Sequence, residues 1–119
     1  MKRTAQEIIE QSFSMLGYDS TPELIKRAVT AVNIIAMDIF YISNTEGFKP
    51  VRYISDTLDF PEEIINDTIP HGVASHIAEM MDDGEKQQIY TAYYNRKRMK
   101  INVNKSVIDV FEGGEGFEV

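Results

Sequence analysis

The chain contains no cysteine, which excludes disulfide bonds, thiolate metal ligands and cysteine nucleophiles. It also has no stretch of ~18 uninterrupted apolar residues, the length needed for a membrane-spanning helix. Residues 4–11 are amphipathic, whereas a signal peptide would carry a continuous apolar run. We therefore expect a protein of the cytoplasm, or of an assembly built there, with no membrane contact.

Candidate catalytic and metal-binding residues are scarce. The only histidines, His71 and His76, are five residues apart, so on a helix they would point about 140° away from each other. The acidic cluster of residues 79–85 lacks the alternating oxygen ligands of a calcium loop. No nucleophile and base lie together in the sequence. We expect no enzyme activity, no cofactor and no metal site.

The net charge of −7 argues against nucleic-acid binding through the whole surface. A chain of 119 residues is long enough for one domain that buries roughly 65% of its unfolded surface.

The strongest apolar pattern lies in residues 22–42, where apolar residues recur at steps of three and four. Thr21 is placed to cap this segment and Pro22 suits the first helical position. The sequence predicts one long helix here. Met37 and Tyr41 fall outside its core stripe, so either this is the central helix of a bundle or part of it meets another chain.

Three further helices are expected around it. The capping box formed by Thr4 and Glu7 predicts a short first helix that ends at Gly17. Residues 51–60 read as an extended segment or small hairpin. Pro70 predicts a break near residues 66–68, with a new helix beginning there and ending at residues 82–84.

The fourth expected helix covers residues 85 to about 100. Its predicted buried stripe is Ile89, Tyr90, Tyr93 and Tyr94. The whole is expected to be mainly all-α, a small bundle of about four helices in residues 1–100 followed by a C-terminal arm in residues 101–119. The arm has apolar residues with few ways to bury them in their own bundle. They are Val103, Val107, Val110 and Phe111.

Acidic and basic residues are segregated along the second half of the chain. The basic run at residues 96–100 is interpreted either as a contact for phosphate or an acidic protein, or as a helix end whose cations complement the dipole. Together with Met37 and Tyr41, the acidic cluster of residues 79–85 and the basic run of residues 96–100 form a candidate subunit interface. Their members are Glu79, Asp82, Asp83, Glu85, Arg96, Lys97, Arg98 and Lys100.

Residues 58–98 resemble the second half of phage head–tail connector (adaptor or head-completion) proteins. The matching elements, in order, are Phe60-Pro61-Glu62-Glu63, Gly72-Val73-Ala74, Ala78-Glu79, Asp83-Gly84-Glu85 and Tyr94-Asn95-Arg96-Lys97-Arg98. The first half, with a short helix that ends in Leu16-Gly17-Tyr18 and then a longer helix, agrees with the helical layout of that family.

The resemblance implies a structural virion protein of the neck, present in the host cytoplasm during assembly. About a dozen copies would form a ring below the portal protein, extend the DNA channel without specific DNA binding, and provide the docking surface for tail or stopper proteins. The C-terminal arm is expected either to order against the portal or a neighbouring subunit, or to fold back over its own bundle. The alternative is a small helical interaction or regulatory protein that acts as a monomer or dimer.

Overall fold

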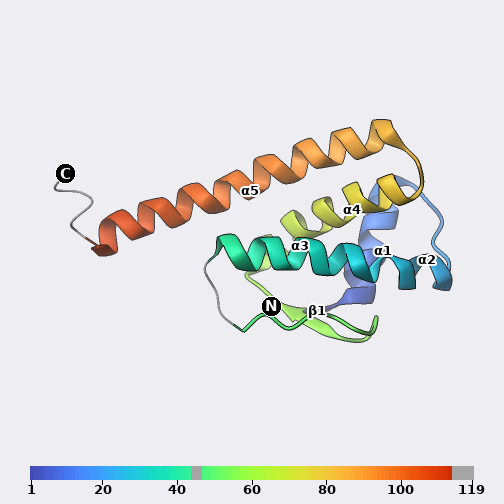
Figure 1. The fold of residues 1–119 in the computed structure, drawn as a ribbon, viewed down its shortest axis with the longest axis horizontal. Coiled ribbons are helices and arrows are strands. Elements are labelled where there is room, and N and C mark those ends of the chain that lie inside the picture. The colour runs from blue at the N-terminus through green and yellow to red at the C-terminus, as the bar shows by residue number, and fades with distance from the viewer. Residues whose placement is uncertain (44–46, 114–119) are drawn as a thin grey trace.

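The computed structural model describes residues 1–43 and 47–113, with side chains as far as Ile101. Helices make up most of the described chain, together with one two-stranded sheet (Figure 1). The elements are β1 (Lys2–Thr4), α1 (Ala5–Leu16), α2 (Pro22–Arg27), α3 (Val29–Ile42), β2 (Thr57–Asp59), a π-helical segment η1 (Ile64–Thr68), α4 (Ile69–Met80) and α5 (Gly84–Gly113). With α2 and α3 taken as one interrupted helix, this confirms the expected mainly helical bundle of about four helices.

Helix α1 begins and ends as its sequence predicts. The Thr4 hydroxyl accepts a hydrogen bond from the Glu7 backbone N–H at 3.1 Å, and the Glu7 carboxylate accepts one from the Thr4 N–H at 3.0 Å. Gly17 ends the helix in the left-handed conformation, with φ 77°. This end favours glycine because a Cβ is strained at such a φ. Residues within a few positions of each end therefore mark both boundaries.

The long helix expected over residues 22–42 is interrupted at Ala28. The Ala28 N–H is shared between the carbonyls of Leu24 and Ile25, at 3.0 and 3.1 Å, and its ψ of −8° ends α2. Thr21 does cap α2, accepting from the Leu24 N–H at 3.2 Å. The apolar stripe runs through the interruption, with Ala28 itself buried, so the apolar period carries no signal of the break.

The central helix is α4, not the segment of residues 22–42 for which that place was expected. It packs against α1, α3 and α5. Eight of its twelve residues are buried: Ile69, Pro70, Gly72, Val73, Ala74, Ser75, Ile77 and Ala78. A helix buried around most of its circumference must have neighbours on several sides.

Residues 51–60 do not form a local hairpin. Within this segment, β2 pairs antiparallel with β1 at the start of the chain, in the register Lys2↔Asp59 and Thr4↔Thr57. The extended conformation was predicted correctly for residues 57–59, whereas residues 53–55 form a turn. The hairpin alternative is wrong, because the pairing partner lies more than fifty residues away and leaves no mark on the local pattern.

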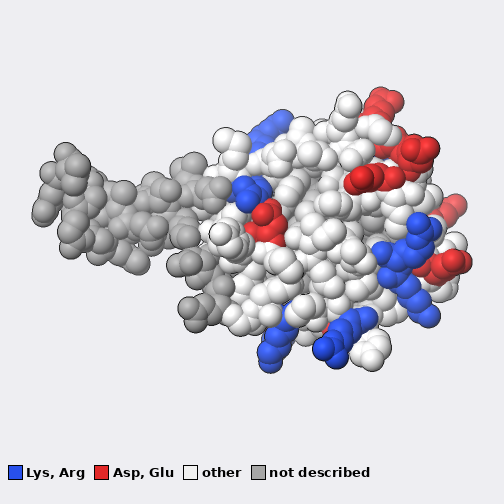
Figure 2. Space-filling view, in the orientation of Figure 1, with Lys and Arg blue, Asp and Glu red and all other residues white. Residues whose placement is uncertain are grey.

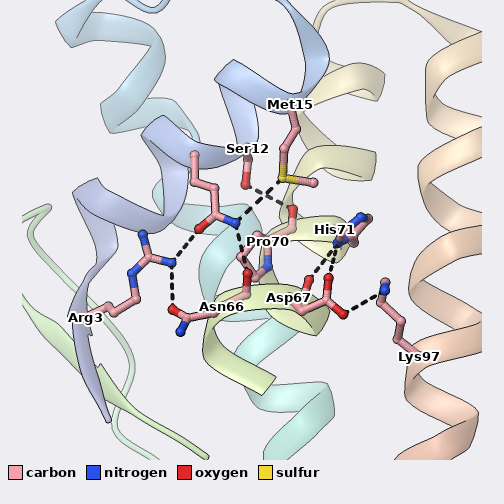
Figure 3. Close-up of polar contacts among 9 residues, drawn as sticks. Arg3, Ser12, Met15, Asn66, Asp67, Pro70, His71 and Lys97 are labelled. Atoms are coloured by element: carbon pink, nitrogen blue, oxygen red, sulfur yellow. Dashed lines mark hydrogen bonds and ion pairs between the residues drawn. The ribbon is translucent and has the colours of Figure 1, made fainter. Parts of the chain in front are cut away.

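No break separates α4 from the segment before it, contrary to the expectation from Pro70. The chain passes from η1 straight into α4, and the Ile69 N–H bonds the Ile64 carbonyl, five residues back. Proline leaves a helical carbonyl without its usual donor. The Asn66 carbonyl, four residues before Pro70, instead accepts a hydrogen bond from the Gln11 side-chain amide at 2.9 Å (Figure 3). The π-helical turn and this donor from α1 together accommodate the proline.

Helix α5 runs to Gly113, well beyond the end expected at about Lys100. Its second half extends past the other helices (Figure 1), and the molecule measures 54 Å along its longest axis. The helix thus crosses the expected boundary between bundle and arm without interruption. The side chains of Val103, Val107, Val110 and Phe111 lie outside the described residues, so the binding role of the arm stays a prediction.

Candidate interaction surfaces

The acidic turn between α4 and α5 divides into a structural and an exposed part. Asp83 is structural: its carboxylate accepts from the Lys86 N–H at 3.1 Å and from the Tyr18 hydroxyl, which ties the turn to the end of α1. The Tyr18 bond is the main cause of a lowered pKa at Asp83. Burial, followed by the bond to Asp83, raises the pKa of Tyr18 to about 12.

The other acidic candidates face solvent. Glu79, Asp82 and Glu85 are exposed, and Asp82 adopts a positive φ of 58° at the corner. Glu79 lies 3.9 Å from the ring of His76. Acidic side chains gather at this end of the molecule, over the turn that joins α4 to α5 (Figure 2). These three residues remain available to a partner.

The basic run on α5 divides in the same way. Arg98 forms a bidentate pair with Asp38 of α3, with its Nε 2.6 Å and its Nη2 2.9 Å from the carboxylate oxygens. Lys97 lies 2.7 Å from Asp67 of η1. Both cations thus fasten α5 to its own chain, which the sequence could not show because their partners are 60 and 30 residues away.

Arg96 and Lys100 remain exposed. The Arg96 guanidinium lies over the ring of Tyr93, 5.7 Å from its centroid, and Lys100 faces solvent. The predicted subunit interface therefore stays a prediction, with Arg96 and Lys100 as its free cations on α5.

Asp38 is the centre of the α3–α5 clamp. It also accepts a hydrogen bond from the Tyr94 hydroxyl at 2.6 Å. The Arg98 hydrogen bond is the largest cause that lowers the pKa of Asp38 below 3.8; burial opposes it, and the Tyr94 bond adds to it. Burial, followed by the bond to Asp38, raises the pKa of Tyr94. The three groups stabilise one another in the ionised-carboxylate state.

The predicted buried stripe of α5 is only half correct. Tyr94 is buried, and Tyr90 is partly buried with its hydroxyl 2.9 Å from the Met15 carbonyl. Ile89 and Tyr93 are 42% and 40% exposed. Helix α5 covers the bundle from one side only, so its apolar stripe is narrower than the spacing of its aromatic residues suggests.

His71 and His76 lie apart, as their spacing predicts. His71 packs against the rings of Tyr90 and Tyr93, which also contact each other. Its Nδ1 lies 2.7 Å from the Asp67 carbonyl (Figure 3). Within the part of the chain that the structure describes, no group of three or more His, Asp or Glu side chains is placed to hold a metal ion. No described helix is long and apolar enough to cross a membrane.

An exposed apolar stripe runs along α3. Met37 and Tyr41, the two residues that fell outside the predicted core stripe, are 54% and 84% exposed, and Ile34 is 48% exposed. The three residues are spaced by three and four along the helix, so they lie on one side of it. Ile34 was missed, although its position three residues before Met37 was the signal that could have found it.

A second surface, a groove beside α2, was not expected. It has a volume of about 350 Å³ and is lined by Lys26, Val29, Thr30, Arg52, Tyr53 and Ile54. The sequence gives no sign that residues 26–30 and 52–54 meet, because they belong to separate elements more than twenty residues apart.

Several of the residues that carry the family resemblance make contacts that hold the fold together. Gly72 lets α4 approach Ile35 and Tyr94, and Asp83 and Arg98 make the contacts described above. These three residues therefore account for the architecture more directly than for a function. Comparison with known protein families, with curated proteins and with solved structures finds no match.

Proposed function

We propose that this chain is a structural phage virion protein: a head–tail connector that forms a ring below the portal, extends the DNA channel and provides the docking surface for the tail. The role rests on the ordered resemblance of residues 58–98. It is a non-enzymatic role in which the chain acts through its surfaces, and its partners are portal, tail or stopper proteins and further copies of the chain.

The structural observation that supports assembly is the apolar stripe of α3. Soluble monomers rarely expose contiguous apolar patches larger than a few hundred Å², whereas aromatic and methionine side chains are enriched in the buried centres of interfaces. Tyr41 is 84% exposed on a helix whose opposite side is packed in the core. A neighbouring subunit that covers Met37 and Tyr41 would gain roughly 1.5–3 kcal/mol for each buried side chain.

Two further features fit a place in a ring around DNA. Helix α5 reaches beyond the bundle (Figure 1), which gives the chain a means to contact a protein above or below it. The exposed acidic residues Glu79, Asp82 and Glu85 would repel a DNA backbone that passes nearby, so they suit a channel through which DNA slides without binding.

The test is assembly with portal rings of the phage that encodes this chain, measured by analytical ultracentrifugation and electron microscopy. We expect the wild-type chain to bind in a fixed stoichiometry. Tyr41→Asp should weaken binding roughly 30-fold or more, the scale of a hot-spot residue worth about 2 kcal/mol. Its melting temperature should be unchanged because Tyr41 is largely exposed.

The matched control is Gln88→Asp, an equal change of charge at an exposed position of α5. It should bind portal as the wild type does. Failure of the wild-type chain to bind portal at any concentration would overturn the proposal.

A helical interaction or regulatory protein that acts as a monomer or dimer is the second candidate. The stripe on α3 favours it equally, since one partner helix would cover it. Its expected signature is an unchanged mass when portal rings are added, together with loss of the dimer on Tyr41→Asp.

A further inference from the structure

The walls of the groove beside α2 are held in place by contacts within the chain, as in a preformed binding site. One wall is the α2–α3 junction and the other is the loop of residues 52–54. The Asp56 carboxylate accepts hydrogen bonds from the N–H groups of Arg52 and Tyr53, at 2.8 and 2.9 Å, which holds the loop in its turn.

The same loop is fastened to the start of α1. The carbonyls of Ile54 and Asp56 accept from the N–H groups of Gln6 and Ala5, both at 2.9 Å. These two donors belong to the first helical turn, which has no partners inside the helix. The loop therefore completes α1 and is held in place by it, so a ligand of the groove need not order the loop.

The chemistry of the groove combines positive charge with apolar surface. Lys26 and Arg52 are exposed, and neither is in an ion pair with a described residue. Tyr53 is 69% exposed, while Val29 and Ile54 supply apolar lining. Tyrosine and arginine side chains on a rigid loop are typical of interface hot spots. The groove suits an aromatic side chain flanked by carboxylates.

The end of this chain has that composition. Residues 111–119 read FEGGEGFEV, a segment with three glutamates (Glu112, Glu115 and Glu118), two phenylalanines and no cation. The described helix α5 ends at Gly113, at the opposite end of the molecule from α2 (Figure 1). Residues 114–119 span at most about 20 Å when extended, whereas the long axis measures 54 Å. The segment therefore cannot reach the groove of its own copy.

We propose that the groove of one copy binds residues 112–119 of a second copy. Glu115 and Glu118 pair with Lys26 and Arg52, and Phe117 packs against Tyr53. Because the two contact surfaces differ, the arrangement is head-to-tail and repeats from copy to copy. The contact involves this chain alone, so it stands or falls separately from portal binding.

The test uses a fluorescein-labelled peptide of residues 110–119, titrated with the full chain and followed by fluorescence anisotropy. The receptor carries Glu115→Lys and Glu118→Lys, so that its own segment does not compete. We expect saturable, micromolar binding that weakens as salt is raised. Adding Lys26→Glu and Arg52→Glu to the receptor should weaken it about tenfold or more.

The matched control adds Arg96→Glu and Lys100→Glu, the same change of charge at exposed positions of α5, and should bind as the unaltered receptor does. In the rescue experiment the receptor is the full chain with Lys26→Glu and Arg52→Glu, and its Glu115 and Glu118 are unchanged. A peptide that carries Glu115→Lys and Glu118→Lys should bind this receptor. Circular dichroism melting checks that each variant is folded.

Three outcomes would overturn the proposal. They are no peptide binding up to about 1 mM protein, equal weakening by the groove and control substitutions, and no rescue by the charge-reversed peptide. A short DNA duplex serves as a second probe. If the duplex binds with the same dependence on Lys26 and Arg52 while the peptide does not, the groove is a phosphate-binding site and the assignment of its occupant is wrong.

Discussion

Substitution of Gly72 by alanine tests the closest helix contact in the molecule. A Cβ built on Gly72 would lie 2.8 Å from Cδ1 of Ile35, 2.8 Å from Cδ1 of the Tyr94 ring and 2.9 Å from Cγ2 of Ile35. Distances under 3.0 Å force a neighbour to move. The Tyr94 ring is held by its hydroxyl bond to Asp38, and Cγ2 of Ile35 is held by the single χ1 rotamer that isoleucine strongly prefers in a helix.

Two effects of opposite sign decide how much Gly72→Ala changes the free energy of unfolding. Overpacking of a dense core costs about 1–3 kcal/mol, and we place Gly72→Ala in the upper half of that range because three contacts are too short. Alanine gains about 1 kcal/mol over glycine in a helix interior. The net expectation is a loss of about 1–2 kcal/mol in the free energy of unfolding, which lowers the melting temperature by roughly 4–8 °C for a domain of this size.

Gly84→Ala is the matched control. Gly84 starts α5, its φ is not positive, and a Cβ there would meet no atom within 4 Å. The same substitution should therefore be neutral or stabilise the fold by a few tenths of a kcal/mol. Urea denaturation of both variants, with thermal melting alongside, measures the difference.

A double mutant locates the clash. Ile35→Val removes Cδ1 but keeps Cγ2, so the combination with Gly72→Ala should cost less than the sum of the two single changes. If Gly72→Ala is as stable as the wild type, or Gly84→Ala loses as much, then the close approach of α4 to α3 and α5 is wrong.

Two further predictions concern polar contacts. Gln11→Ala removes the donor to the Asn66 carbonyl and should cost about 1–3 kcal/mol in urea denaturation; Gln11→Glu, which keeps an acceptor for Arg3 but cannot donate to the carbonyl, should not restore the loss. Asp38→Asn should cost about 1–2 kcal/mol at pH 7. Because the folded-state pKa of Asp38 is lowered, its contribution to the free energy of unfolding is present above pH ~4 and is lost as the pH falls below that. The stabilities of wild type and Asp38→Asn should therefore converge in acid. A constant difference between them from pH 7 to pH 2 would contradict the clamp.

Much of the local structure could be predicted from the sequence because its causes are local. The capping box at Thr4, the end at Gly17 and the cap at Thr21 each depend on side chains within a few residues of the backbone groups that they satisfy. The structure confirms all three. The interruption at Ala28 escaped prediction because the buried stripe continues through it.

Long-range contacts account for the rest. The local sequence around Pro70 is compatible either with a break in the helix or with a π-helical turn. The choice between them depends on a hydrogen-bond donor from Gln11 in another helix. Lys97 and Arg98 form a basic run in the sequence, yet carboxylates from distant elements pair both of them. The candidate interface could therefore be located only in part, since spacing reveals charge but not its partner.

The two ion pairs made by Lys97 and Arg98 hold α5 against the bundle shortly before the helix extends past it. They are the last described ion pairs along the helix. Ile101, one turn further on, still packs against the core, and at 1.5 Å per residue the part of α5 beyond it is about 18 Å long. A change of about 10° in the direction of the helix at Ile101 would move its end at Gly113 by roughly 3 Å. The geometry of two carboxylates, Asp38 and Asp67, thus helps to fix the direction in which α5 leaves the bundle, and a small change at either carboxylate would give a larger displacement at Gly113.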